Sequence, residues 1–318
     1  MRKVIFLMFT ITIALPLHAQ MNLKNLDIGF NRQQQAKKEY VREKELLKIY
    51  LIKAKPTLAQ EVKIKNDFIP LDQALKQDLI IISETSQGGS VNELIFHNVS
   101  KHHIMLQMGD VITGGKQDRV IKTDYILQPG EKAVIDVYCV EKGRWSSSQQ
   151  GVAQFNEYHS RISNDVRRTI STDGNQQAVW NQVDAIHESN DSQNSSSTYA
   201  AVTSNSRNLS HINSYVDFFY SQFRNMTDIV GLVAVSGNKV IGADIFASNK
   251  LLQNNLRNLL QSYATEAVLH GSEVSLSESS VHAWIHNLLE NEDKQKEIIN
   301  RSGSAVQVEG KNLKISAF

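Results

Sequence analysis

Between residues 68 and 140 the chain contains five short segments that are rich in β-branched and aromatic residues, with no helical stretch between them. Turn-forming clusters separate the segments, as at Gln87-Gly88-Gly89 and Gln128-Pro129-Gly130. Strands that follow one another through short turns pair antiparallel, so this region is restricted to a sandwich or a curled sheet. The predicted strands are Leu79–Ser83, Val91–His97, His103–Met108, Arg119–Leu127 and Ala133–Val140.

After Gly151 helical periodicity replaces the short strands. Hairpins are expected around Ser236-Gly237-Asn238 and Gly310-Lys311-Asn312. The order of elements has no βαβ rhythm, which disfavours a Rossmann or (β/α) barrel fold. The sequence therefore predicts the α+β class, with an antiparallel β-sandwich-like N-terminal half and a helix-rich α/β C-terminal half. The predicted helices are Asn175–Ile186, Asn208–Arg224, Ser248–His270 and Val281–Leu289.

A basic segment precedes the predicted strands. Asn31 to Lys55 contains eight basic and three acidic residues, and its apolar residues recur at helical spacing with a gap near Glu43. We expect an amphipathic helix that docks on the body by one face; the alternative is a membrane-surface or partner-binding role. The predicted organisation is a signal peptide at 1–19, this helical segment at 20–66, a β-rich part at 67–150 and a helix-rich part at 151–318. The last two parts are expected to pack as one unit.

The first nineteen residues have the layout of a secretory signal peptide. Arg2 and Lys3 form the positive start, an apolar run follows from Val4 to Leu17, and Ala19 offers a small residue for cleavage. The apolar run is shorter than the roughly 20 residues that span a bilayer, and no later stretch is long and apolar enough to do so. We therefore expect a periplasmic or secreted protein with no transmembrane segment after signal cleavage.

The charge balance argues against nucleic acid as a partner. Loss of Arg2 and Lys3 with the signal peptide reduces the 34 basic residues to 32, against 33 acidic residues. Such a balance exerts no general attraction on a polyanion. Cys139 is the single cysteine, which excludes an internal disulfide, and its alternation with Val137 and Ile135 predicts a buried thiol rather than a nucleophile.

The densest group of polar and glycine residues lies between Leu106 and Trp145. Gly109, Gly114 and Gly115 fall within seven residues, and Lys116 follows them. Glycines let backbone N–H groups approach an anion, so a phosphate cradle is one reading, but a tight turn between strands is favoured. The spacing matches neither a P-loop nor a dinucleotide fingerprint, and no cofactor is expected.

Gln117 and Arg119 are two residues apart, so in a strand they point to the same face. Glu141 continues the buried face of Cys139 and needs a partner, for which Arg119 and Arg144 are the candidates. One interpretation is a salt bridge that locks two strands. The other is a clamp for an anionic ligand, with Glu141 as a candidate base and Trp145 as a wall; Gly114, Gly115 and Lys116 complete the candidate ligand-binding set.

His282 and His286 are four residues apart on one predicted helix, a spacing that can hold zinc. The glutamate of the metalloprotease motif is absent, because Ala283 follows His282. Surface histidines are the favoured interpretation, and no metal site is predicted.

The block around Gly109 to Trp145 resembles the ARG and rhodanese-phosphatase-superfamily-associated protein domain family, where ARG stands for ADP-ribosylglycohydrolase. The resemblance runs from about Phe68 to His270, and the chain departs from the family pattern at Asp118 and Lys142, where members tend to carry Asn and Gln. The family is named for genomic neighbours, so the resemblance implies no particular activity; for a cytoplasmic member it would hint at ADP-ribose or RNA-linked processes. The matching segments are Leu71–Leu75, Gly109–Arg119, Cys139–Trp145, Gln177–Trp180 and Gly231–Phe246.

Two functions remain open from the sequence. The first is an exported ligand-binding or interaction module, whose partner is an anionic small molecule or a protein. The second is an enzyme that acts on a phosphate-, ADP-ribose- or sugar-containing ligand at the same polar pocket. A ligand response that depends on Arg119 would support a binding site there.

Overall fold

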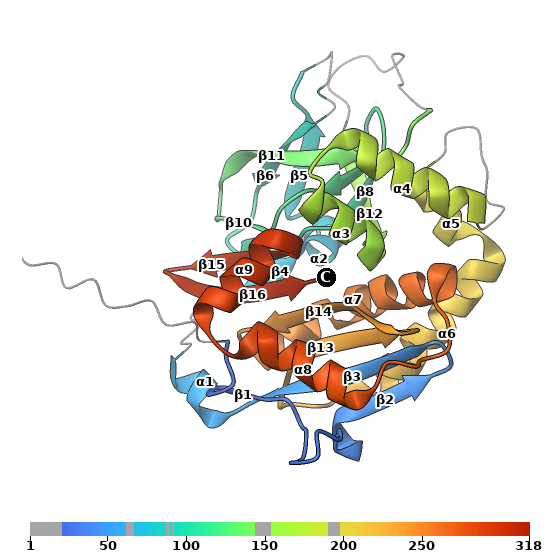
Figure 1. Ribbon diagram of the computed structural model, residues 1–318. Helices are drawn as coiled ribbons and strands as arrows, with labels where there is room; N and C mark the ends of the chain where they lie inside the picture. The colour runs from blue at the N-terminus through green and yellow to red at the C-terminus, as the bar shows by residue number, and fades with distance from the viewer. Residues whose placement is uncertain (1–20, 62–66, 87–89, 91, 144–153, 190–197) are drawn as a thin grey trace, which may run out of the picture.

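The computed structural model describes residues 21–318 except 62–66, 87–89, 91, 144–153 and 190–197 (Figure 1). The α+β class predicted from the sequence is confirmed, since antiparallel sheets and helices both make up large shares of the described chain. Two β units dominate the fold, a closed barrel and an open sheet, and Figure 1 shows the barrel above the sheet.

Six strands of the described chain close into the barrel in the order β11-β6-β5-β12-β8-β9. The barrel replaces the predicted sandwich-like arrangement, because β9 pairs with both β8 and β11 and so leaves no open edge. A short sheet, β10-β7-β4, lies beside it. The barrel strands are β5 (Ile80–Glu84), β6 (Glu93–Asn98), β8 (Asp110–Gly114), β9 (Arg119–Ile121), β11 (Lys132–Cys139) and β12 (Gln154–Arg161).

The short sheet consists of β4 (Phe68–Pro70), β7 (His103–Leu106) and β10 (Tyr125–Leu127). The sequence predicted one strand from Arg119 to Leu127, and the structure divides it into β9 and β10. Asp124 lies between the two strands, and its carboxylate accepts the backbone N–H of Met108 at 2.8 Å. Helix α2 (Leu71–Lys76) follows β4 and buries Leu71 in the barrel core.

The open sheet has seven strands in the described chain, with β2 paired to β3 beside the path β1-β3-β13-β14-β16-β15. Both predicted C-terminal hairpins are present in it, as β13–β14 and β15–β16. The strands are β1 (Leu26–Asp27), β2 (Val41–Lys44), β3 (Leu47–Ala54), β13 (Ile229–Ser236), β14 (Lys239–Phe246), β15 (Gly303–Val308) and β16 (Lys311–Ala317).

The amphipathic helix predicted for Asn31–Lys55 is wrong. This segment forms a 3-10 turn at Lys38–Tyr40 and then the β2–β3 hairpin. The physical reason is the run Ile49 to Ile52, four consecutive residues that are all buried in the core of the open sheet. A strand covered on both faces reads as a continuous apolar run, and such a run has no period to distinguish strand from helix.

Helix α7 (Asn249–His270) lies between the two β units, where it contacts β13 and β14 of the sheet and β12 of the barrel. The predicted boundaries are confirmed: the Ser248 hydroxyl caps its start, and Gly271 follows its end. Figure 1 shows α8 crossing the sheet in front of β13 and β3. The other helices are α1 (Pro56–Glu61), α3 (Asn164–Thr172), α4 (Gln176–Ser189), α5 (Tyr199–Ser204), α6 (Ser206–Phe223), α8 (Glu278–Leu289) and α9 (Glu292–Ser302).

Strand pairing crosses the boundary expected near residue 150. β12 follows that boundary but completes the barrel, and β1 to β3 precede the β-rich part but pair with the sheet built by β13 to β16. In the part of the chain that the structure describes, no helix is long and apolar enough to cross a membrane.

Candidate functional site

Polar side chains lie at the end of the barrel where β5 and β11 end and β9 begins, which is called the barrel mouth below. Strand alternation explains their position, because Glu84 follows the buried Ile82 by two residues on β5. By the same rule Arg119 shares the inner face with Ile121, and it pairs in register with Cys139 of β11. Glu84, Arg119 and Cys139 each have 0% exposed surface, so the mouth is polar but closed to solvent at these positions.

Arg119 and Glu141 lie in one hydrogen-bond network, which runs through Gln117. Arg119 Nη1 donates to the carbonyl oxygen of Gln117 at 2.8 Å, and Gln117 Nε2 donates to the carbonyl oxygen of Glu141 at 2.9 Å. The Glu141 carboxylate accepts the backbone N–H of Asp118 at 3.0 Å. These contacts join the start of β9 to the residues that follow β11.

The sequence did not single out Glu84, although its carboxylate forms an ion pair with Arg119 at the mouth. Oε1 of Glu84 lies 3.7 Å from Arg119 Nη2 and accepts the backbone N–H of Lys116 at 3.2 Å. The detectable signal was its alternation with Ile80 and Ile82, which places a carboxylate on a core-facing position of β5.

The glycines of the block form turns, as favoured from the sequence. Gly109, Gly114 and Gly115 have φ values of 92°, 116° and 52°, where residues with a Cβ are strained. A Cβ on Gly115 would lie 2.2 Å from Cζ of Phe155, and the Gly115 N–H donates to the carbonyl oxygen of Gln154 at 2.9 Å. This N–H therefore serves the barrel closure, which supports a turn over a phosphate cradle.

Cys139 is buried as predicted, and its thiol lies 3.1 Å from Oε1 of Gln117. Burial raises the pKa of the thiol to about 11, although the Arg119 guanidinium opposes that rise. The thiol is therefore protonated near neutral pH, a state in which cysteine is a poor nucleophile. Gln176 fixes the same strand end, since it both accepts the N–H and donates to the carbonyl of Cys139.

Lys116 is 9% exposed and completes the described part of the mouth. Glu84, Asp118 and Glu141 are buried carboxylates of the same region, and Arg119 is fully buried beside them. The predicted residues Arg144 and Trp145 lie outside the described residues.

A second buried polar group, which the sequence analysis missed, joins the barrel to the open sheet around Asp244. The Asp244 carboxylate accepts hydrogen bonds from Arg167 Nη2 at 2.7 Å and from the Tyr263 hydroxyl at 2.7 Å. Lys314 Nζ lies 3.8 Å from it and 3.0 Å from Asp124. Arg167 holds the pKa of Asp244 well below its usual range despite burial, so the side chain is an anion. Asp244 interrupts the apolar strand β14, and that interruption was the available signal.

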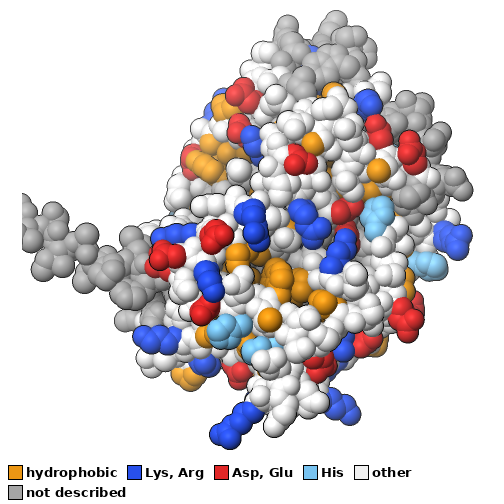
Figure 2. Space-filling model, in the orientation of Figure 1, with side chains coloured by type: hydrophobic (Ala, Val, Ile, Leu, Met, Phe, Trp, Pro, Cys, Tyr) orange, Lys and Arg blue, Asp and Glu red, His pale blue; other side chains and the backbone are white. Residues whose placement is uncertain are grey.

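Asp110 extends this polar layer to the base of the barrel. Its carboxylate pairs with Arg161 Nη2 at 2.9 Å and accepts the Tyr158 hydroxyl at 3.1 Å. Beside it, burial and the Asp110 charge raise the pKa of Asp72. On the face drawn in Figure 2, hydrophobic side chains gather near the centre, where the barrel meets the sheet, with Lys and Arg side chains next to them. On this face, the surface where the barrel meets the sheet is therefore partly apolar.

Asp165 of α3 and Glu266 of α7 form a buried pair of carboxyl groups. The Asp165 N–H donates to Glu266 Oε2 at 3.0 Å, and His270 Nε2 lies 3.3 Å from Asp165 Oδ2. Burial and the neighbouring Asp165 raise the pKa of Glu266 well above its usual value, whereas the pKa of Asp165 is lowered. Glu266 therefore holds the proton that the pair shares.

The histidines singled out from the sequence lie next to each other on α8, with their rings tilted by 42°. The rings of His282 and His286 are 5.8 Å apart, and burial with the His286 charge lowers the pKa of His282. Among the described residues, no group of three or more His, Cys, Asp and Glu side chains is placed to hold a metal ion.

Comparison with known proteins gives one result for the whole fold. Residues 37–318 match the model of the ARG and Rhodanese-Phosphatase-superfamily-associated Protein domain. The match covers most of the chain, so the chain belongs to this family. Neither the curated proteins nor the solved structures gave a match.

Proposed function

We propose that this member of the ARG and Rhodanese-Phosphatase-superfamily-associated Protein domain family is a binding module that holds a small polar ligand at the barrel mouth. The proposal rests on one observation. On two strands, the side chain that faces the barrel interior is apolar at one position and ionisable two residues away, toward the mouth. Ile82 gives way to Glu84 on β5, and Ile121 gives way to Arg119 on β9. Barrel mouths are frequent ligand sites, because the strands hold converging side chains on a rigid frame.

The energetics of the mouth support a role other than stability. Removing an arginine and a carboxylate from water costs several kcal/mol per ion, and apolar residues of similar volume are often as stable or more stable. Arg119 and Glu84 are both 0% exposed, yet their closest ion-pair contact is 3.7 Å, which is longer than an ideal charge-assisted hydrogen bond. An ion pair that is kept in the fold despite this desolvation cost is suited to recognising a ligand.

The mixture of side chains at the mouth suits a ligand that carries hydroxyl groups. Glu84, Asp118 and Glu141 are buried carboxylates, Lys116 and Arg119 are buried cations, and Gln117 adds an amide. Carboxylates accept hydrogen bonds from hydroxyl groups, while Lys116 and Arg119 donate to hydroxyl or ring oxygens. A sugar or ribose unit fits this set of donors and acceptors. The anionic ligand and the protein partner expected from the sequence are the competing proposals.

The enzymatic alternative draws less support from the same contacts. Glu141, the candidate base, already accepts the Asp118 N–H at 3.0 Å and is 3% exposed. The Cys139 thiol has a pKa of about 11 and would need activation before it could attack a substrate. The proposal therefore assigns binding, and no catalytic step, to the mouth.

A thermal-shift panel tests the proposal with neutral sugars, sugar phosphates, ADP-ribose and nucleotides. A ligand present at 100 times its Kd adds about 2.7 kcal/mol to stability, which raises the melting temperature visibly. We expect a hydroxyl-rich compound to shift the wild type and to lose its effect in Gln117→Met and Arg119→Met. Arg257→Met, which removes an exposed arginine of α7, is the matched control. No shift with any compound, or a shift retained in both mouth variants, would refute the assignment.

We also propose that the chain is exported, with Met1–Ala19 as the signal peptide. The proposal rests on Arg2, Lys3 and the apolar run that follows them. Expression in a bacterium, followed by cell fractionation and mass measurement, tests it: the exported form should begin near Gln20. Recovery of the full-length chain from the cytoplasm alone would contradict it.

A further inference from the structure

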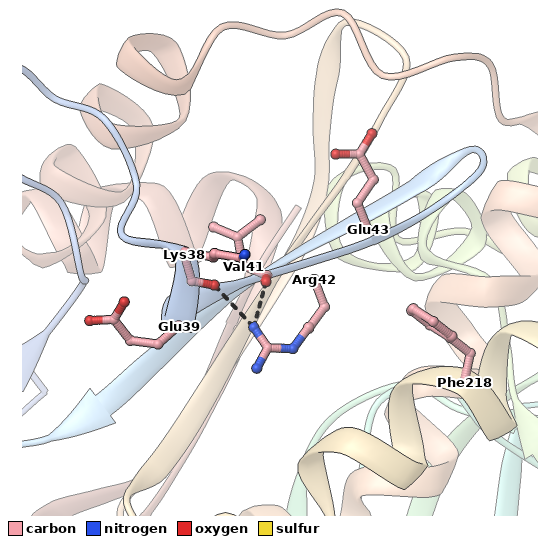
Figure 3. A pocket seen from close by; sticks show the side chains of 6 residues that line it. All are labelled: Lys38, Glu39, Val41, Arg42, Glu43 and Phe218. Atoms are coloured by element: carbon pink, nitrogen blue, oxygen red, sulfur yellow. Dashed lines mark hydrogen bonds between the residues drawn. The ribbon is translucent and has the colours of Figure 1, made fainter.

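A surface pocket between β2 and α6 has a volume of about 470 Å³, but its lining favours no class of ligand (Figure 3). Lys38 and Arg42 balance Glu39 and Glu43 in the lining, and Arg42 Nη1 donates to two backbone carbonyl oxygens. A balanced lining whose guanidinium is already bonded to the backbone selects neither an anion nor a cation. The buried carboxyl pair between α3 and α7 has, by contrast, a defined charge state and defined partners.

The contacts of this pair show which carboxyl group keeps a proton. Glu266 Oε2 accepts the Asp165 N–H at 3.0 Å, and Lys239 Nζ lies 4.0 Å from the other oxygen of Glu266. The oxygens of Asp165 receive three hydrogen bonds at 2.5 to 2.8 Å. Their donors are Ser163 Oγ, the Val166 N–H and Gln182 Nε2. Hydrogen bonds to a carboxylate favour its ionised form, so Asp165 is the anion and Glu266 keeps the proton.

Loss of that proton leaves a second buried charge that the described residues compensate poorly. The Glu266 side chain is 3% exposed, whereas Lys239 of β14 is 53% exposed, so water screens its charge. The other ionisable groups at the pair are Tyr199 of α5 and His270, which lies 3.3 Å from Asp165. Burial raises the pKa of the Tyr199 hydroxyl, which stays protonated. The start of α3 already has the carboxylate of Asp165, and like charges this close repel each other.

Helix α4 connects the pair to the barrel mouth. Gln182 donates to Asp165 at 2.7 Å, and Gln176, at the start of the same helix, bonds the backbone of Cys139. Gln176 accepts the Cys139 N–H at 2.7 Å and donates to the Cys139 carbonyl oxygen at 2.8 Å. The position of α4 therefore depends on the carboxyl pair at one point and determines contacts with the end of β11 at another.

A second series of hydrogen bonds reaches the mouth through the start of α5. The Ser163 N–H donates to the Tyr199 hydroxyl at 3.0 Å, and the Tyr199 N–H donates to the carbonyl oxygen of Val140 at 2.9 Å. Thr198, the N-cap of α5, donates to the Asp118 carboxylate at 2.7 Å. Figure 1 shows α3, α4 and α5 grouped beside the barrel, above α7. A shift at the start of α3 therefore disturbs contacts at the mouth through two helices.

We propose that the Asp165–Glu266 pair is a pH-operated contact: with its shared proton it keeps α3, α4 and α5 closed over the barrel mouth, and without that proton they loosen there. The proton passes to water, since Asp165 and His270 are 14% and 28% exposed in their side chains. Repulsion between the two carboxylates then displaces the start of α3. Easier entry of a ligand at high pH rests on the binding role proposed for the mouth, whereas the loosening itself does not.

The single cysteine, Cys139, is a probe of this opening, because its thiol has no exposed surface in the closed mouth. Its rate of labelling by iodoacetamide is measured by mass spectrometry between pH 7 and 9.5 and divided by the rate for a peptide copy of residues 136–143. The ratio removes the pH dependence of thiol reactivity and reports the fraction of open molecules. We expect it to rise roughly tenfold or more, because the proton equilibrium changes by that factor for each pH unit above the pKa of Glu266.

Two variants and one further measurement assign the rise to this contact. Glu266→Gln can still accept the Asp165 N–H but has no proton to lose, so its ratio should stay constant over the same range. Glu273→Gln removes an exposed carboxylate just beyond α7 and is the matched control, which should keep the wild-type rise. In wild-type hydrogen exchange, the amides at the start of α5 should lose protection at pH 9.5 while those of β13 keep it, as a local opening requires.

A constant ratio in the wild type, a rise that persists in Glu266→Gln, or a loss of protection that includes β13 would overturn the proposal. These measurements use no ligand, so they stand even if every compound fails to bind the mouth. A compound that binds the mouth while the labelling ratio stays constant would reject the pH-operated contact and leave the binding role intact.

Discussion

Replacing Asp244 by Asn is expected to destabilise the fold by about 3–5 kcal/mol, the cost of removing one partner from a buried ion pair. The carboxylate accepts two hydrogen bonds from Arg167 and one each from Tyr263 and Ser316, at 2.6 to 3.1 Å. The amide retains one oxygen and presents N–H groups to a site surrounded by donors. Arg167 then loses its buried ion-pair partner, and Lys314 keeps only the carboxylate of Asp124; both side chains are 0% exposed. Proteins of this kind are stable by about 5–15 kcal/mol, so the loss is a large fraction of the total.

Urea unfolding followed by circular dichroism measures this loss. Asp217→Asn is the matched control, because Asp217 pairs with Arg257 at the surface, where such pairs contribute about 0–1 kcal/mol. The pKa of Asp244 is lowered in the folded state from its ordinary value of 3.8, so its contribution is present above pH 4 and is lost as the pH falls below that value. Wild-type stability should therefore fall more steeply than that of Asp244→Asn between pH 4 and 2. A loss no larger than that of Asp217→Asn would refute the reasoning.

Three further predictions follow from other contacts. Glu266 has a raised pKa in the folded state, so its contribution is complete below its unfolded value of 4.5 and is lost as the pH rises; Glu266→Gln should flatten the decline of stability measured by urea unfolding between pH 5 and 8, and an unchanged slope would contradict this. Gly115→Ala should cost about 1–3 kcal/mol more than Gly130→Ala in the same assay, because both have positive φ but only Gly115 faces a ring, that of Phe155. The Cys139 thiol, with a pKa of about 11 and no exposed surface, should react with iodoacetamide at pH 7 only after unfolding; labelling of the folded protein, read by mass spectrometry, would show that the mouth opens.

The sequence predicted well the elements that have a regular spacing of apolar residues or residues typical of an element's ends. Helix α7 has a serine cap, an apolar stripe and a following glycine, and both of its ends were predicted within one residue. The β13–β14 hairpin has a turn at Gly237, whose φ of 58° suits glycine. Local chemistry determines such boundaries, so they can be read without knowledge of the tertiary structure.

The errors arose where tertiary contacts decide the structure. The run Ile49 to Ile52 is apolar because the sheet is covered on both faces there. The lysines that flank this run produced the pattern of polar residues expected for the exposed face of a helix. Closure of the barrel depends on β9, a strand of three residues that pairs with β8 and β11. Nothing local to Arg119–Ile121 indicates two partners, so a sandwich and a barrel could not be separated from the sequence.

The candidate site shows the same division. Alternation correctly placed Cys139 on the buried face of its strand, where it pairs in register with Arg119, because two-residue periodicity is a local property. The ion-pair contact with Glu84 comes from a strand 35 residues earlier, and the pairing order β5-β12-β8-β9 that brings it near is a property of the closed barrel.

The two polar ends of the barrel are joined by β8, a strand of five residues. Asp110 at its start pairs with Arg161 of β12 at the base of the barrel, and Gly114 at its end begins the turn that leads to Arg119 at the mouth. β8 is short and pairs with β12 on one side and with β9 on the other. Its two ends are therefore held in fixed positions relative to each other. The glycine-rich turn therefore starts from a defined point, set by the Asp110–Arg161 pair. On this argument the Asp110–Arg161 pair at the base fixes the start of β8, and the length of β8 fixes where the turn that leads to Arg119 begins.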